Sequence, residues 1–291
     1  MASVIAVTPT RHGRAVVLHA AAPSHACDHP EMPDLRVDVT DHIATVTLDR
    51  PPVNAIITAT MVEIAEVFSA LGERRDVRVV IFTAAGHRAF IAGVDLTTVG
   101  SRDRGPDVPA ALVTDPARAA RDAMWAITDC AVPVIAAVNG PALGAGLAFA
   151  ACCDIIVAAD NATFGTTEIN VGLLGASAHL RLLVGRHKAR ELFFTGDTIT
   201  AAELHRLGAV RTVVPRTALL EEAGVLASEL AAKSPIALRL AKESMNRVEW
   251  LPLKEAYRTE QDYTARLLGF EDAKEARAAF LEKREPDWKW S

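Results

Sequence analysis

The stretch from residue 133 to residue 168 constrains the fold of this 291-residue chain more than any other. Its pattern predicts a buried strand over 133–138, a glycine-bearing turn over 139–144, a helix over 145–152 and a second strand over 155–159. The first strand is a continuous apolar run, which is typical of a strand covered on both faces. The helix that follows carries little side-chain bulk or polarity, so it has to be buried as well.

This buried helix has a chemical consequence. The N–H groups of its first turn have no carbonyl partner within the helix, and they lie at the positive end of the helix dipole. Buried donors of this kind suit a negative charge that develops on an oxygen atom. The glycines of the turn can also serve only to allow a tight bend, and spacing alone does not decide between the two interpretations.

Strands and helices alternate over most of the remaining chain, which predicts an α/β fold with a largely parallel sheet. A strand pair is expected near the start, and a run of helices is expected near the end. The other predicted strands cover 35–40, 42–49, 77–84 and 209–214. The other predicted helices cover 57–73, 117–129, part of 172–185, 187–194, 200–207, 217–233, 235–248, 252–268 and 271–284.

These elements divide the chain into three parts. Residues 1–34 form an N-terminal extension with weak periodicity, expected to be disordered or loosely docked. Residues 35–215 form the α/β core, within which the polar segment 101–116 is expected to be mobile, and residues 216–291 form a helical C-terminal region.

Charge and composition exclude several classes of function. The net charge of −5, without a concentrated basic stripe, argues against a nucleic-acid partner. No apolar run reaches the roughly 18 residues of a membrane span, which with the lack of a clear signal peptide predicts a cytoplasmic protein. The four cysteines have no CxxC spacing, so buried free thiols are expected and no metal site is predicted.

A dinucleotide site is the first functional alternative. Gly144, Ala145 and Gly146 follow a strand and open a helix, and Asp160 ends the next strand. However, Phe149 stands where the third glycine of that fingerprint allows close helix–strand packing. The connection is also short for a complete βαβ unit, so this interpretation is disfavoured.

A pair of backbone donors is the second alternative. The loop 89–96 follows a buried strand, just as 143–146 does. One N–H group from each loop could converge on a thioester carbonyl. Losing one such donor typically costs about 3 kcal/mol of transition-state stabilisation.

Several segments together resemble the crotonase (enoyl-CoA hydratase/isomerase) superfamily. They are RAFIAGVDL, PVIAAVNGPALGAG, ACCDIIVAADNATFGTTEINVGL, ARELFFTGDTITAAELHRLGAV and EDAKEARAAFLEKREP, and the resemblance covers about residues 35–286. It implies a core of ββα repeats wound as a spiral, packed by the helical C-terminal region. It also implies an acyl-CoA thioester as substrate, with CoA as part of the substrate and no separate cofactor, and a homotrimer or homohexamer.

The resemblance also assigns residues. It makes the backbone N–H groups of Val94 and Ala145 the oxyanion donors. Contacts to substrate or CoA would come from two loops and the C-terminal end, at Ala89, Ile91, Ala92, Gly93, Asp95, Leu96, Gly144, Phe280 and Lys283. A purely structural role for Asp95 and a solvated surface position for Lys283 are the alternatives.

The acid–base group departs from the pattern of a typical hydratase, which the resemblance implies has two glutamates. Ala148 stands at the first glutamate position, whereas Glu168 keeps the second. An isolated glutamate between apolar strands is costly to bury without a role, and a raised pKa would suit general acid–base work. Ala176 replaces the aspartate of dienoyl-CoA isomerases, and His179 is expected near the pocket entrance.

One carboxylate is sufficient to move a proton between C2 and C4 of an enoyl thioester. The sequence therefore predicts a Δ3,Δ2-enoyl-CoA isomerase or a single-glutamate enoyl-CoA hydratase. Some hydratases and hydratase-lyases of aromatic enoyl-CoAs are also similar to this chain, with a single glutamate. They use tyrosines as well, and the only tyrosines here are Tyr257 and Tyr263, in the C-terminal helices. A non-catalytic acyl-CoA-binding protein is the alternative from another class, because Ala148 cannot transfer a proton.

Overall fold

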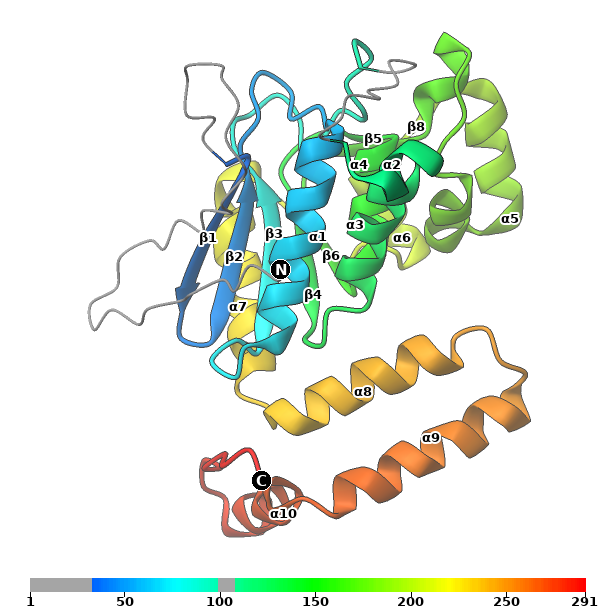
Figure 1. Cartoon of the computed structure of the whole chain (residues 1–291). Coiled ribbons are helices and arrows are strands. Elements are labelled where there is room, and N and C mark those ends of the chain that lie inside the picture. The colour runs from blue at the N-terminus through cyan, green and yellow to red at the C-terminus, as the bar shows by residue number, and fades with distance from the viewer. Residues whose placement is uncertain (1–32, 99–107) are drawn as a thin grey trace.

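Six strands form the main sheet of the protein, whose computed structural model describes residues 33–98 and 108–291 (Figure 1). Their order is β1-β2-β3-β4-β6-β9; β1 runs antiparallel to β2, and all other neighbours are parallel. The predicted strand pair and the largely parallel sheet are thus confirmed. The strands are β1 Leu35–Thr40, β2 Ile43–Leu48, β3 Val79–Ala84, β4 Val134–Val138, β6 Ile155–Ala159 and β9 Thr212–Val214. All but two residues of the predicted N-terminal extension lie outside the described residues.

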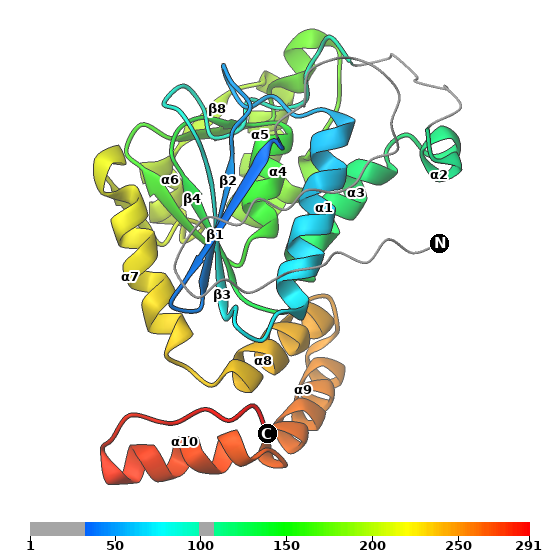
Figure 2. The ribbon, with the colours of Figure 1, turned by 60° about the vertical axis from the view of Figure 1, so that its left-hand side comes forward.

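Helices cover both faces of this sheet, as the continuous apolar strands predict. In β3, Val80 and Phe82 join the core that contains α1 (Thr58–Glu73) and α3 (Arg118–Thr128). The alternate residues Val79 and Ile81 join a second core built with α7 (Leu219–Ala231). Figure 2 shows α7 on one side of the strands and α1 with α3 on the other.

A second, smaller layer of short strands was not predicted. It contains β5 (Ala142–Leu143), β7 (Thr163–Gly165) and β8 (Thr198–Thr200). Single bridges extend the layer by pairing Ile56 with Val94 and Ile91 with Ala142. Strands β2, β3, β4 and β6 are therefore each followed by a short strand or bridge and then by a helix. This repeat agrees with the ββα pattern that the resemblance implies; the residue ranges of the short strands were not predicted, because two or three residues are too few to show an alternating pattern.

The remaining helices of the core agree with the prediction except at one place. They are α2 Ala110–Thr114, α4 Ala145–Cys152, α5 Ser177–Thr195 and α6 Ala201–Leu207, with 3₁₀ turns η1 at Thr167–Val171 and η2 at Arg216–Ala218. The backbone of α5 is not helical at Gly185, and this kink divides α5 into two helical parts, as the two predicted helices require. Helix α2 lies in the segment 101–116, for which no helix was predicted.

Three helices form a C-terminal arm, residues 235–291, which projects from one end of the α/β body in both views. They are α8 Pro235–Val248, α9 Leu253–Leu268 and α10 Glu271–Glu282. The side chain of Lys242 on α8 is buried against the core. Its Nζ lies 2.7 Å from Asp154 Oδ2 and donates to the carbonyl oxygens of Ile127 and Val132. This buried contact fixes α8 on the end of the main sheet.

Candidate active site

The two glycine-bearing loops lie directly against each other. Leu143 N donates to Ile91 O at 2.9 Å. A β-carbon added to Gly93 would lie 3.5 Å from Leu143 O, and one added to Gly146 would overlap the Ile91 carbonyl. The first turn of α4 therefore packs backbone to backbone on the loop 89–96, an approach that only glycine allows at residue 146.

This contact leaves two N–H groups available near each other. Their neighbours are bonded, since Asp95 N donates to Ile56 O and Gly144 N donates to Gly165 O. Among the described residues, by contrast, no acceptor receives the N–H of Val94 or of Ala145. Ala145 is the first residue of α4, so its N–H is one of the donors that a helix leaves free. Gly144, with φ of 53°, makes the turn into the helix.

The carboxyl group of Glu168 lies at the same turn. A β-carbon added to Gly144 would be 2.7 Å from Glu168 Oε1, and one added to Gly175 would be 2.5 Å from it. The group is thus held between two glycine backbones. Its Oε2 is buried and has no hydrogen-bond partner among the described residues. Burial raises the pKa of the Glu168 carboxyl, which favours its use as a proton carrier.

At the first of the two glutamate positions expected of a typical hydratase, the side chain is a methyl group. Ala148 lies one helical turn after Ala145, is fully buried, and its N–H donates to Gly144 O. Ala176 adopts φ of 53° and begins α5. Glu168 is therefore the acidic residue that the structure places against the turn.

Two other buried polar atoms near Glu168 in the sequence also lack partners within the described part of the chain. These are Thr166 Oγ1 and His179 Nδ1, and burial lowers the pKa of the His179 imidazole, which favours its neutral form. Native structures contain few unpartnered buried polar atoms, and such atoms call for an explanation such as a catalytic role. A catalytic role for His179 stays a prediction.

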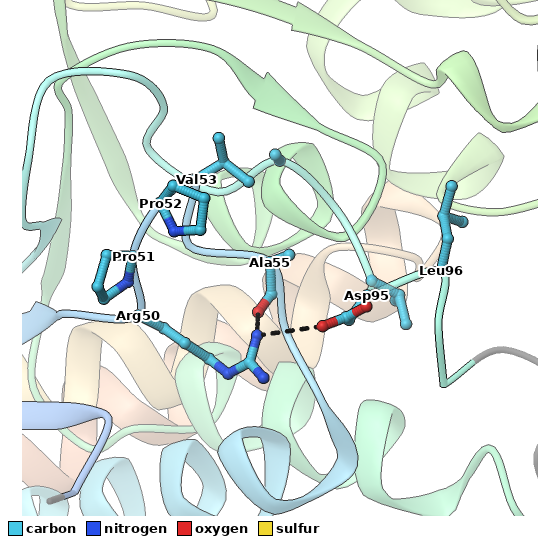
Figure 3. Close-up of a pocket in the computed structure, with 9 residues that line it drawn as sticks. Arg50, Pro51, Pro52, Val53, Ala55, Asp95 and Leu96 are labelled. Atoms are coloured by element: carbon cyan, nitrogen blue, oxygen red, sulfur yellow. Dashed lines mark hydrogen bonds and ion pairs between the residues drawn. The ribbon is translucent and has the colours of Figure 1, made fainter.

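A cavity of about 510 Å³ opens beside Val94 (Figure 3). The turn 50–55 forms one wall of it, and the loop 92–96 forms the other. The lining residues are Arg50, Pro51, Pro52, Val53, Ala55, Ala92, Val94, Asp95 and Leu96. Val94 therefore belongs to both the cavity wall and the pair of free N–H groups.

Arg50 lines the cavity and was not predicted as a site residue. Its guanidinium donates to Ala55 O at 2.6 Å and lies 3.4 Å from Asp95 Oδ2. Hydrogen bonds from Thr97 and, less strongly, the contact with Arg50 lower the pKa of the Asp95 carboxyl. In the sequence, the paired prolines after Arg50 indicate only that a strand ends there. They do not indicate a cavity, because the loop that forms its other wall lies about 40 residues further along the chain.

The remaining predicted contact residues divide into two groups. Ala89, Ile91 and Gly93 are buried behind the cavity wall and do not line it. Phe280 lies on α10 and is 82% exposed, and Lys283 caps that helix. In both views α10 lies at the end of the molecule away from β5 and β8, so one chain does not bring these two residues to the cavity. Their contact with CoA stays a prediction that requires a second copy.

Two further findings concern the described residues, 33–98 and 108–291, alone. They contain no group of three or more His, Cys, Asp or Glu side chains arranged to hold a metal ion. None of their helices is both long and apolar enough to cross a membrane.

The chain is similar to several known proteins. A family model described as "Enoyl-CoA hydratase/isomerase" matches residues 38–291. A (7aS)-7a-methyl-1,5-dioxo-2,3,5,6,7,7a-hexahydro-1H-indene-carboxyl-CoA hydrolase of Rhodococcus jostii is 42% identical over 84% of this chain and 93% of its own. The 2,3-dehydroadipyl-CoA hydratase of Escherichia coli is 35% identical over 89% and 99%. A crystal structure of an enoyl-CoA hydratase from Bacillus anthracis superposes with a TM-score of 0.81 at 32% identity, over 89% of this chain and all of that one.

Proposed function

The chain belongs to the enoyl-CoA hydratase/isomerase family and has its crotonase fold, and we propose that it forms and stabilises the enolate of an acyl-CoA thioester with one carboxylate. In this proposal the N–H groups of Val94 and Ala145 bind the thioester oxygen, and Glu168 moves the proton. The observation that carries it is the Glu168 carboxyl, buried at the turn of Ala145 with Oε2 unpartnered among the described residues.

For an enoyl thioester the steps balance without a second residue. Glu168 removes a proton from C2, so the C–H bond breaks and the electron pair moves onto the thioester oxygen. Hydrogen bonds from the two N–H groups stabilise that charge. Glu168 then returns the same proton to C4, which moves the double bond from C3 to C2. In hydration the same carboxyl would take a proton from water as oxygen adds to C3 and would deliver a proton to C2. Exchange of the carboxyl proton with solvent while the enolate is present would bring solvent hydrogen into the product.

Ala148 favours isomerisation or a one-carboxylate hydration over the route with two glutamates. It supplies no group that could hold a water molecule jointly with Glu168. The cavity beside Val94 would take part of the CoA moiety, with Arg50 as a cationic lining residue. A homotrimer or homohexamer and a cytoplasmic location complete the proposal.

A hydrolase is the second candidate. Relatives from Rhodococcus jostii and Mycobacterium tuberculosis, both named as hydrolases of a carboxyl-CoA that bears two ring ketones, are 42% identical to this chain, compared with 35% for the named hydratase of Escherichia coli. An enolate-stabilising site also suits hydrolysis of a ring ketone. Water would add to the ketone carbon and the adjacent ring carbon–carbon bond would break; the departing carbon would leave as an enolate, which the site stabilises, and would then take up a proton.

Ultraviolet absorbance separates these reactions. A 3-enoyl-CoA and a 2-enoyl-CoA of several chain lengths are each mixed with the protein. Growth of the conjugated thioester band from the 3-enoyl substrate identifies an isomerase, and its decay from the 2-enoyl substrate identifies a hydratase. A cyclic dioxo acyl-CoA that gains one water without releasing free CoA thiol identifies ring hydrolysis.

Deuterium exchange tests the shared step in the same samples. In D₂O, the enolate mechanism predicts exchange at C2 of an acyl-CoA thioester, read by mass spectrometry. If acyl-CoA binds but neither exchange nor turnover occurs, the chain is a binding protein and the proposal is wrong.

A further inference from the structure

We propose that Gly175 is a positioning residue for Glu168: its backbone holds the carboxyl against Gly144, and the missing side chain leaves the space that the carboxyl occupies. The inference rests on the proposed role of Glu168 as the proton carrier. It concerns a residue that lies outside both oxyanion loops and does not line the cavity.

The surroundings of Gly175 point to Glu168 alone. A β-carbon built there meets three atoms within 4 Å as its nearest neighbours, and all three belong to Glu168. They are Oε1 at 2.5 Å, the carboxyl carbon at 3.4 Å and Cγ at 3.8 Å. A separation of 2.5 Å is far inside van der Waals contact, so an alanine at this position would displace the carboxyl or the loop.

Backbone conformation does not explain this glycine. Gly172 has φ of 72°, in the left-handed region, whereas Gly175 lies outside that region. The next residue, Ala176, does have a positive φ of 53° although it carries a β-carbon. The loop therefore has its glycine beside the carboxyl and an alanine at the position where glycine would relieve backbone strain.

The two glycines that flank Oε1 differ in how cleanly they can be tested. Gly144 has φ of 53° and makes the turn into α4, so an alanine there would strain the backbone as well as contact the carboxyl. Gly175 carries only the steric requirement. Displacement of a catalytic group by about 1 Å can cost on the order of 100-fold in rate, so the effect should appear in kcat.

The experiment compares Gly175→Ala with Gly224→Ala. Gly224 lies in α7 and has no atom within 4 Å of an added β-carbon, so it is the matched control. The rate is measured with the acyl-CoA that turns over or, failing that, as deuterium exchange at C2. We expect kcat of Gly175→Ala to fall by about 10- to 100-fold with little change in KM, while Gly224→Ala keeps parental values.

A double-mutant cycle separates positioning from general damage to the loop. Glu168→Asp shortens the side chain by one methylene and withdraws the carboxyl from residue 175. If the added methyl acts through the carboxyl, Gly175→Ala should cost about threefold or less when it is combined with Glu168→Asp. An equal loss of rate in both backgrounds, or a kcat for Gly175→Ala close to that of the parent, overturns the inference.

These results are distinguishable from failure of the proposed function. If Glu168→Gln retains full activity, the proposed function is wrong. If Glu168→Gln is inactive but Gly175→Ala is not impaired, only the role of Gly175 is wrong. Urea unfolding of each variant shows whether a loss of rate reflects a loss of folded protein.

Discussion

Two acidic side chains at opposite ends of the molecule are buried in different ways. Asp272, in the first turn of α10, is fully buried, and its two oxygens accept the N–H groups of Lys289 and Trp290 at 2.8 and 3.2 Å. Glu168, beside the turn of Ala145, has a buried oxygen with no partner among the described residues. Burying a charge is costly unless hydrogen bonds compensate it. Asp272 has that compensation, whereas Glu168 has less of it.

The difference extends to the surroundings of each residue. At the C-terminal arm, Asp272 N also donates to Ser291 O, and the Trp290 ring packs over Arg239 at 5.2 Å. The last residues of the chain are thereby fastened to α10 and α8. Two glycines, Gly144 and Gly175, lie against the Glu168 carboxyl and provide space, and Oε2 has no partner among the described residues. We infer that Asp272 holds the arm together and that Glu168 is kept available for substrate.

The sharpest test of this comparison is Glu168→Gln, which keeps the shape of the side chain but removes the proton-carrying group. We expect kcat to fall by about 100- to 10,000-fold, while urea unfolding shows an intact fold. Acyl-CoA binding should persist, because the Val94 and Ala145 donors are unchanged. Turnover at the parental rate would contradict the assignment of Glu168.

Lys242→Met should have the largest effect on stability. It removes the cation that is 2.7 Å from Asp154 and bonded to two carbonyl oxygens. Breaking a buried pair typically costs about 3–5 kcal/mol, and since Asp154 is partly exposed we expect about 2–3 kcal/mol. Urea unfolding measures the change. Lys233→Met, at an exposed position, is the control and should stay within about 0.5 kcal/mol of the parent.

Asp272→Asn should have a smaller and more local effect. The amide NH₂ would face a backbone N–H of Lys289 or Trp290, so one donor loses its acceptor at a cost of about 1–2 kcal/mol. Tryptic cleavage after Lys289, followed by mass spectrometry, should become faster as the tail is released. Asp262→Asn, whose side chain is exposed, should leave the cleavage rate unchanged. Equal rates in all three proteins would show that Asp272 does not fasten the tail.

Much of the active-site end and the three helices of the arm were predictable from local sequence, whereas the contacts that fasten the arm were not. The apolar strand β4, the small-residue helix α4 and the departure at Ala148 are all local signals within about 20 residues. By contrast, the partners of Asp272 are the last residues of the chain, and Arg50 meets Asp95 from 45 residues away. Short strands such as β5 are too brief for periodicity, and the fit of Gly175 against Glu168 depends on coordinates. Contacts of this kind follow from tertiary packing, which no local pattern encodes.

The smallest predicted effect is on stability at Glu168, and it depends on pH. Removing this carboxylate should raise the free energy of unfolding at neutral pH, whereas the substitutions at Lys242 and Asp272 should lower it. Burial raises the pKa of Glu168 in the folded protein, so the folded state binds this proton more tightly than the unfolded chain does. The resulting stabilisation is fully present below the unfolded pKa of about 4.3 and is lost as the pH rises through the folded pKa. At neutral pH the charged carboxylate therefore costs stability.

Glu168→Gln should accordingly be more stable than the parent near pH 7, by about 1 kcal/mol at most. The two proteins should become equal near pH 4, where the parent carboxyl is also uncharged. Urea unfolding of both proteins at the two pH values measures this difference. The parent's kcat/KM should fall on the acid side at a pH above the ordinary glutamate range, because the base is lost at the raised pKa. If Glu168→Gln were less stable than the parent at neutral pH, Glu168 would stabilise the fold as Asp272 does, and the contrast between the two acids would not hold.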